Sequence, residues 1–315
     1  MTLPIPLLSG HIHTLSINWR NHAFSGDLVP FLSHIWRCLG SSLHKLIIVA
    51  PLARMQTILY HASTVTSLQH LELRIQNDNF VPTVTDVHVM RRMLIPLVHR
   101  NMLTLRSLIV KLQPEEMDLS PFIAELPFLP SLAKFEANAI IDEVLLRQFL
   151  LRHAETLIEF SWTRRSLPEH PGTSDEDANV ILRTLSTANA PLRKLGLYVF
   201  DARTLRSLGN LKHSLTELRL EGVKLTSEDL DGLRGMKLQV LRVNVCVLNL
   251  RVVVKLVKLV EYGAEMVIGI GAVESENNIS VSPITFLLHL TCDLCLPLTN
   301  EYRSKVLSNP SFCAL

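Results

Sequence analysis

Several features that mark common classes of protein are absent from this sequence. The N-terminus lacks the basic start and long apolar core of a signal peptide, and no run of about 18 uninterrupted apolar residues could form a membrane helix. No basic run exceeds two residues and the net charge is +2, so nucleic-acid binding is not indicated. Five cysteines without a paired framework favour a reducing compartment. We therefore expect a cytoplasmic or nuclear protein that binds neither nucleic acid nor membrane.

Motifs of common enzymes are absent as well. The chain has 13 His but no His-x-x-Glu-His and no nucleophile elbow, so we expect no enzyme activity, no catalytic residue and no cofactor. Zinc ligands could come from His289, Cys292 and Cys295, with Cys313 downstream. The usual second close pair is missing, which favours buried thiols and no metal site. An enzyme or zinc-binding protein with its site in the C-terminal region is the alternative function.

A repeated pattern of apolar residues is what the sequence does contain. Residues 214–222 read SLTELRLEG, which matches L-x-x-L-x-L, the core consensus of the leucine-rich repeat. Side chains of a strand alternate between its two faces, so Leu218 and Leu220 would face a core and Arg219 the other side.

Nine stretches share this pattern, at spacings of 23 to 37 residues. Their first apolar residues are Ile12, Leu43, Leu68, Leu105, Leu132, Leu157, Leu192, Leu215 and Leu238. Six of these nine follow a hydroxyl residue, namely Ser42, Ser67, Thr104, Ser131, Thr156 and Ser214. Abundant leucine alone would not produce that regularity.

The segments between these stretches have the spacing of helices. Residues 174–187, SDEDANVILRTLST, combine a candidate N-cap with an acidic first turn, and 87–100 form a longer helix that Pro96 kinks or ends. Alternating strands and helices imply a parallel sheet. The strands have one charged face, which argues against a sheet covered on both sides.

These observations predict an α/β fold that is a leucine-rich-repeat solenoid. Strands lie about 4.8 Å apart and helices about 8–10 Å, so the stack curves into a horseshoe with parallel strands on the concave face and helices on the convex face. One buried ladder should run through the strands, formed by Leu46, Leu71, Leu108, Phe135, Phe160, Leu195, Leu218 and Leu241. We expect residues 1–250 to be the repeat array and 251–315 an irregular C-terminal cap or a poorly ordered tail.

Charges of both signs interleave on the predicted concave face, which suits a protein partner better than a one-signed nucleic acid. The candidate binding residues are His70, Glu72, Arg74, Lys111, Lys134, Glu136, Asn138, Glu159, Lys194, Tyr198, Glu217, Arg219, Glu221, Arg242 and Asn244. The predicted function is therefore a non-catalytic protein–protein interaction scaffold.

The irregular SLxxLxL repeats, together with the stretch LQVLRVNVCVL at 238–248, resemble the leucine-rich portion of F-box proteins, fungal ones among them, and more loosely the ribonuclease-inhibitor-like fold. The resemblance covers about residues 10 to 250. It implies a substrate-recognition part of an F-box-type ubiquitin ligase, in which an N-terminal F-box docks the other ligase subunits. No F-box is expected ahead of residue 10, so ligase subunits are expected partners only if an F-box is supplied elsewhere.

Overall fold

The structure of the chain is a computed structural model. It describes residues 12–19, 29–76, 84–113, 118–163, 174–198, 202–225, 230, 233, 235–248, 252, 256, 260–275, 278–279 and 288–291.

The described strands pair into a single sheet in which neighbours in the chain are neighbours in space. Strands β1 to β9 are all parallel. Their bounds are β1 Thr14–Asn18, β2 Lys45–Ala50, β3 His70–Gln76, β4 Ser107–Gln113, β5 Lys134–Ala137, β6 Glu159–Trp162, β7 Lys194–Tyr198, β8 Glu217–Leu225 and β9 Leu238–Leu248. The sheet does not close on itself. The α/β class and the parallel order predicted from the sequence are confirmed.

The predicted ladder is confirmed residue by residue. Leu46 pairs with Leu71, and the register then runs through Leu108, Phe135, Phe160, Leu195 and Leu218 to Leu241. All eight side chains are at most 1% exposed. The Phe135 and Phe160 rings stack with centroids 6.3 Å apart. The same residue position of every repeat therefore lies in the core, because each strand joins the sheet at the same point of its repeat.

Helices or short 3-10 segments connect most of the strands. The bounds are α2 Val29–Leu39, α3 Leu52–Leu59, η1 Ala62–Thr64, α4 Val84–Arg100, α5 Ser120–Glu125, α6 Glu143–His153, α7 Ser174–Thr187 and η2 Ala202–His213. Helix α7 has the bounds that the acidic first turn and apolar spacing predict. Helix α4 does not end at Pro96 but continues through it to Arg100, so that alternative is wrong.

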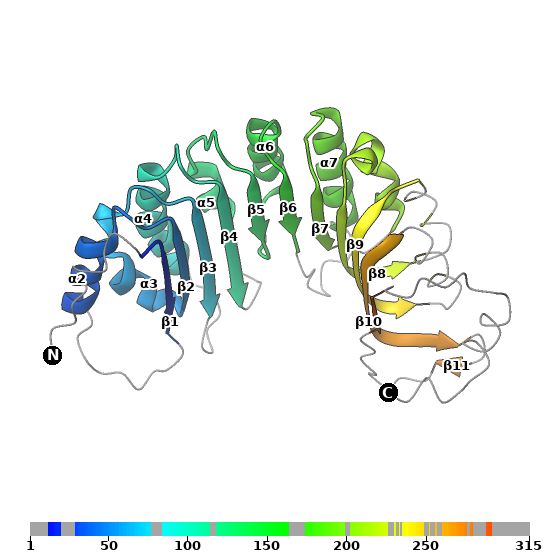
Figure 1. Cartoon of the computed structure of the whole chain (residues 1–315), viewed down its shortest axis with the longest axis horizontal. Helices are drawn as coiled ribbons and strands as arrows, with labels where there is room; N and C mark the ends of the chain where they lie inside the picture. Colours follow the sequence, from blue (N-terminus) through cyan, green and yellow to red (C-terminus); the bar gives the residue numbers. More distant parts are fainter. Residues whose placement is uncertain are drawn as a thin grey trace.

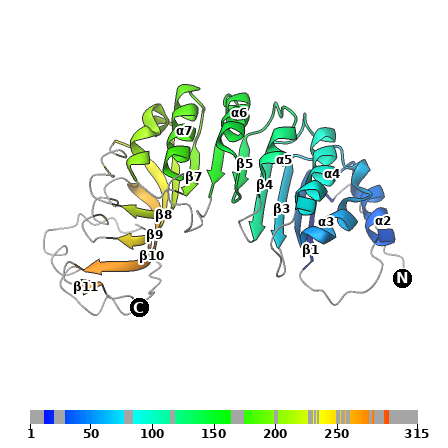
Figure 2. The same ribbon diagram turned by 180° about the vertical axis from the view of Figure 1, so that it is seen from behind.

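The sheet has one side packed against helices and one open side. In β3, Leu71 and Leu73 are buried, whereas the alternate residues His70 and Arg74 are exposed. The buried strand residues share one core cluster with residues of the helices, such as Trp36 of α2. Figures 1 and 2 show the repeats following one another along an arch, with the described helices on its outer side. We call the other side of the sheet, formed by the alternate strand residues, the open face.

Four of the six recurring hydroxyl residues donate a hydrogen bond to a backbone carbonyl about 24–36 residues earlier in the chain. Thr104 Oγ1 donates to the carbonyl of Leu68, and Thr156 Oγ1 donates to that of Leu132, both at 2.8 Å. Ser42 donates to the equivalent carbonyl of Ile12 and Ser131 to that of Leu103, whereas Ser214 donates to the carbonyl of Leu211, three residues earlier. The regularity of Ser and Thr in the sequence thus has a structural cause, since a hydroxyl at this position satisfies a carbonyl of the preceding repeat.

Two buried polar side chains serve a related purpose. Asn101 is 1% exposed; its Oδ1 accepts from Leu68 N–H at 2.7 Å and its Nδ2 donates to the Val65 carbonyl at 2.9 Å. His153, also 1% exposed, accepts from Leu129 N–H through Nε2 at 3.1 Å. Asn101 follows helix α4 and bonds to the backbone before β3. His153 ends helix α6 and bonds to the backbone before β5.

The sheet continues past residue 250. Strand β10, Val260–Ser275, pairs in parallel with β9, although its sequence lacks the repeat pattern. Strands β11 (Asn278–Ile279) and β12 (Leu288–Thr291) then pair with β10 in the antiparallel sense. The division at residue 250 stays a prediction. Within the described residues, no helix is long and apolar enough to cross a membrane.

Candidate binding face

The open face carries its charged residues in rows that cross the strands. One row consists of the first residue of successive strands, and the register runs through His70, Ser107, Lys134, Glu159, Lys194 and Glu217. The next row lies two residues further along each strand, because only alternate residues point to this side. The strand register therefore determines which charged side chains of neighbouring strands lie next to each other.

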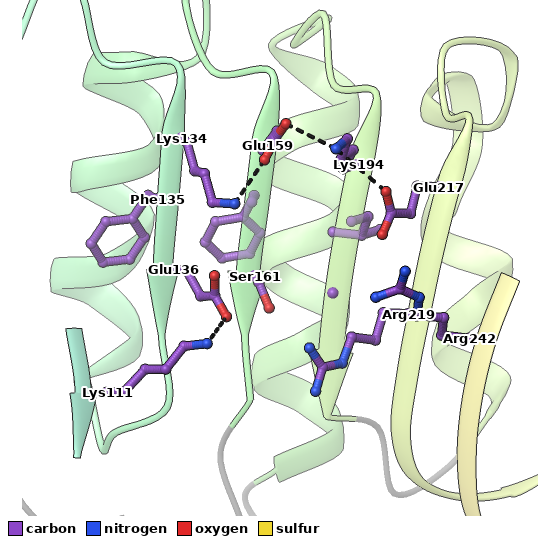
Figure 3. A pocket seen from close by; sticks show the side chains of 13 residues that line it. Lys111, Lys134, Phe135, Glu136, Glu159, Ser161, Lys194, Glu217, Arg219 and Arg242 are labelled. Atoms are coloured by element: carbon purple, nitrogen blue, oxygen red, sulfur yellow. Dashed lines mark ion pairs between the residues drawn. The ribbon is translucent and has the colours of Figure 1, made fainter. Parts of the chain in front are cut away.

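Four residues of the first row form a continuous chain of ion pairs. Lys134 Nζ lies 3.0 Å from Glu159 Oε2, while Lys194 Nζ lies 3.2 Å from Glu159 Oε1 and 3.5 Å from Glu217 Oε2. Figure 3 shows the four side chains in line across β5 to β8. Signs alternate along the chain, so its charges balance within the sheet.

The ion pairs shift the pKa values of the two central residues, Glu159 and Lys194. Burial alone would raise the pKa of Glu159, but hydrogen bonds and charge from Lys134 and Lys194 outweigh it and lower the pKa. The hydrogen bond that Lys194 donates to the Glu159 carboxylate is the main cause that raises the pKa of Lys194. Both residues thus stay charged at neutral pH, each held by its neighbours.

A shallow depression lies beside this chain, in the second row. Its floor is Ser161 of β6 and Gly196 of β7, which are register partners, with Arg219 and Arg242 next along the same row. A Cβ at Gly196 would come within 2.4 Å of Ser161 Oγ, so a larger residue there would force the Ser161 hydroxyl to move. The two smallest side chains of the row thus lower the open face between Glu136 on one side and the arginines on the other.

The depression differs from a small-molecule site. Its volume is about 230 Å³. Sites for small molecules occupy about 300–1,000 Å³ and are lined mainly by apolar groups. Eight of the thirteen lining residues here are charged: Lys111, Lys134, Glu136, Glu159, Lys194, Glu217, Arg219 and Arg242. The size and lining suit one polar side chain of a larger partner.

The structure brings part of the predicted binding residues together on the open face. Nine of them line or adjoin the depression, namely Lys111, Lys134, Glu136, Glu159, Lys194, Glu217, Arg219, Glu221 and Arg242. Lys111 pairs with Glu136 at 2.9 Å, and Arg219 pairs with Glu221. Asn244 is exposed two residues beyond Arg242, and Tyr198 is described only as a strand position.

The remaining predicted residues lie apart from the depression. Arg74 Nε lies 2.6 Å from Glu72 Oε1, a same-strand pair on β3. His70 lies nearby, where burial and then the charge of Lys45 lower its pKa, so the ring is neutral at neutral pH. The Asn138 amide forms two hydrogen bonds with the backbone of Leu112, at 2.6 and 3.0 Å. It therefore links the end of β5 to β4.

Sequence reasoning missed Ser161 and Gly196. Counted from the first apolar residue of its repeat, each is the fifth residue, which faces the open side. They were not predicted because only charged and larger polar side chains were considered as binding residues. The signal was present, because two adjacent repeats carry their smallest residues at the same position. A search for small residues in register would have located the depression.

The zinc alternative cannot be assembled from the described residues. His289 is described as part of β12, and Cys292, Cys295 and Cys313 lie outside the described residues. Across the described segments, no three His, Cys, Asp or Glu side chains are grouped so that they could hold a metal ion.

No protein-family model matches the chain, and the search of curated proteins found no match.

Proposed function

We propose that this protein is a non-catalytic protein–protein interaction scaffold built as a leucine-rich-repeat solenoid, with the open face as the concave binding surface. The observation that carries the proposal is the depression in the open face, which is lined by interleaved charges of both signs. Complementary charges of both signs select a protein partner and fix its register, whereas a nucleic acid requires an excess of basic groups.

The repeat architecture supports the same reading. Nine strands enter the sheet at the same point of an L-x-x-L-x-L pattern, and hydroxyl residues link successive repeats. In solenoids of this kind, each repeat contacts mainly its neighbours and the curved surface offers an extended platform for a partner. The open face is such a platform, and its charges are already ordered by ion pairs with one another.

The resemblance to F-box proteins extends the proposal. The chain would act as the substrate-recognition part of a ubiquitin ligase in the cytoplasm or nucleus, and the substrate would lie on the open face. Ligase subunits would join only through an F-box supplied elsewhere. The regular position of Ser or Thr before the repeat consensus, together with the strand register, supports the repeat assignment on which this extension rests.

An affinity capture with matched variants tests the proposal. Wild-type protein is compared with the double variant Glu217→Ala, Arg219→Ala on the open face and with Arg147→Ala, Glu155→Ala on the helical side, where both residues are exposed. We expect proteins retained by the wild type and by the helical-side variant to be lost with the open-face variant. Retention by the open-face variant together with loss from the helical-side variant would overturn the proposal.

Ligase subunits provide the second readout of the same experiment. A chain supplied with an F-box domain at its N-terminus should retain both the substrate and the ligase subunits. If the open-face partner is retained but ligase subunits are not, the scaffold function stands and the ligase role is wrong.

A further inference from the structure

The turns that lead from helices into strands lie along one edge of the sheet, because parallel strands all begin at the same edge (Figure 1). Backbone hydrogen bonds of 2.8 Å join four of these turns in a row. Ala133 N–H donates to the Arg106 carbonyl, Ile158 N–H to that of Ala133, and Arg193 N–H to that of Ile158. We call these four turns the turn edge; they are residues 101–106, 126–133, 154–158 and 188–193.

Three neighbouring turns of this edge expose large apolar side chains. Leu103 is 67% exposed, Phe128 55% and Ile158 39%. The residues directly before β2, β3, β4, β7 and β8 are polar, whereas Ile158 stands directly before β6. The Ser131 hydroxyl donates to the Leu103 carbonyl, which ties the first of the three turns to the second. Apolar side chains gathered on adjacent turns of a surface mark an interaction site.

Phe128 is held in place without a partner. Its ring stacks on the ring of His153, with the two centroids 5.5 Å apart. Pro127 and Pro130 stand on either side of it in the sequence and restrict the backbone of the turn. A side chain that is already ordered loses little conformational freedom on binding. Phe128 is therefore suited to act as an anchor for a partner.

The turn edge also has an excess of positive charge. The turns and the last turns of the helices before them carry four exposed arginines: Arg100, Arg106, Arg152 and Arg193. Two acidic residues lie in the same segments, Glu125 and Glu155, and Glu125 is paired with Arg91. No ion pair joins Glu155 or any of the four arginines to another described residue. Four arginines against Glu155 alone leave a net charge of +3.

Two of the arginines define a spacing. Arg100 and Arg152 lie at helix C-termini, where they offset the helix dipole, but Arg106 and Arg193 end no helix. The strands that follow these two, β4 and β7, are three strand spacings apart, which is about 14 Å. In an extended peptide, at about 3.4 Å per residue, two acidic residues four positions apart span the same distance. Ile158 lies between the two arginines in the row.

We propose that the turn edge is a second protein-binding surface, which takes an extended peptide segment with two acidic residues four positions apart and apolar residues between them. The carboxylates pair with Arg106 and Arg193, and the apolar residues pack on Phe128 and Ile158. Aromatic residues and Arg are enriched in protein interfaces, and Arg binds a carboxylate through two parallel N–H donors, which favours a protein over a membrane. The surface lies beside the open face, so the inference does not depend on the function proposed there.

The test uses the full chain and the rhodamine-labelled peptide Glu-Leu-Phe-Leu-Glu, blocked at both ends, with binding followed by fluorescence anisotropy. Leu-Phe-Leu-Glu-Glu has the same composition without the spacing, and Gln-Leu-Phe-Leu-Gln keeps the apolar residues without the charge. We expect the first peptide to bind about tenfold more tightly than either control. Equal binding of the first two peptides, or no binding of the first at concentrations up to about 1 mM, would overturn the inference.

Variants of the chain locate the bound peptide. Arg106→Gln and Arg193→Gln should each weaken binding about fivefold, whereas Arg183→Gln, at an exposed position of α7, should leave it within about twofold. Equal weakening by Arg183→Gln and Arg106→Gln would show general electrostatic attraction and would contradict the proposal.

The apolar contact has its own pair of variants. Phe128→Ser should weaken binding about tenfold, as for an interface anchor, whereas Val144→Ser, which is 58% exposed on α6, should have little effect. Urea unfolding shows whether Phe128→Ser still folds, and Ile158→Ser provides a second test of the same contact. Full binding by both folded variants would overturn the apolar contact and the proposal with it.

Vesicles of phosphatidylcholine and phosphatidylserine distinguish a lipid surface from a peptide. We expect the wild-type chain not to sediment with them, and sedimentation that is lost with Phe128→Ser would assign the turn edge to a membrane and overturn the inference. The open-face variant Glu217→Ala, Arg219→Ala should bind Glu-Leu-Phe-Leu-Glu normally. Loss of the peptide with that variant would contradict a separate second surface, whereas loss of the open-face partner alone supports both proposals.

Discussion

Replacing Leu218 tests the assignment of faces within a single strand. The side chain is 0% exposed, and its register partners Leu195 and Leu241 are at most 1% exposed. Strand pairing on both sides holds the backbone of β8 in place, so the cavity left by Leu218→Ala cannot collapse fully. A buried Leu→Ala change of this kind costs about 2–5 kcal/mol of unfolding free energy, a large part of the 5–15 kcal/mol typical of proteins.

The adjacent residue supplies the control. The side chain of Arg219 is 46% exposed and its one described ion pair, with Glu221, is at the surface. Arg219→Ala should therefore change the unfolding free energy by about 1 kcal/mol or less. Urea unfolding followed by circular dichroism measures both variants under the same conditions. If Arg219→Ala is as destabilising as Leu218→Ala, or if Leu218→Ala is harmless, the two faces of β8 have been assigned wrongly.

Three further predictions concern buried and charged groups. Asn101→Ala leaves the Leu68 N–H and the Val65 carbonyl without their partner, and should cost about 2–6 kcal/mol in urea unfolding, at about 1–3 kcal/mol per unsatisfied group. Burial is the main cause that lowers the pKa of His153, so the unfolded chain binds its proton more readily. Stability should fall as the pH drops below about 6.5, the ordinary His pKa, and His153→Asn should show a smaller fall; an unchanged pH profile would contradict this. Glu159→Gln should cost about 1 kcal/mol or less and should cost less still in 1 M salt. Since the Glu159 pKa is lowered, its contribution is present above about pH 4.5 and is lost as the pH falls through the folded value, which an acid titration of both proteins would reveal.

The core residues and the order of the strands could be predicted from the sequence. A period of two places Leu218 and Leu220 on one face, and a shared repeat pattern brings equivalent residues such as Phe135 and Phe160 into register. Strand β10 could not be predicted in this way, because it pairs with β9 without carrying the repeat pattern. Its place in the sheet depends on the edge that β9 offers and not on a local signal.

The candidate site was only partly predictable. The sequence places Lys194 and Glu217 on the open face, but their pairing depends on the alignment of two strands whose paired residues are 23 positions apart in the chain. The alternation of the strand also predicts Asn138 as a binding residue, but its amide is hydrogen-bonded to the backbone of Leu112. Such partners are brought near by the fold, so spacing along the chain does not reveal them.

The most direct test of the central claim is a photo-crosslinking experiment on the partner captured by the wild-type chain. A benzophenone amino acid is placed at Val240, which faces Glu217 in the register of the open face, or at Gln148, which is exposed on helix α6. A protein scaffold that binds through the open face predicts crosslinks to the partner from Val240 and none from Gln148. Crosslinks from Gln148 alone would show that the partner binds the helical side and would contradict the account.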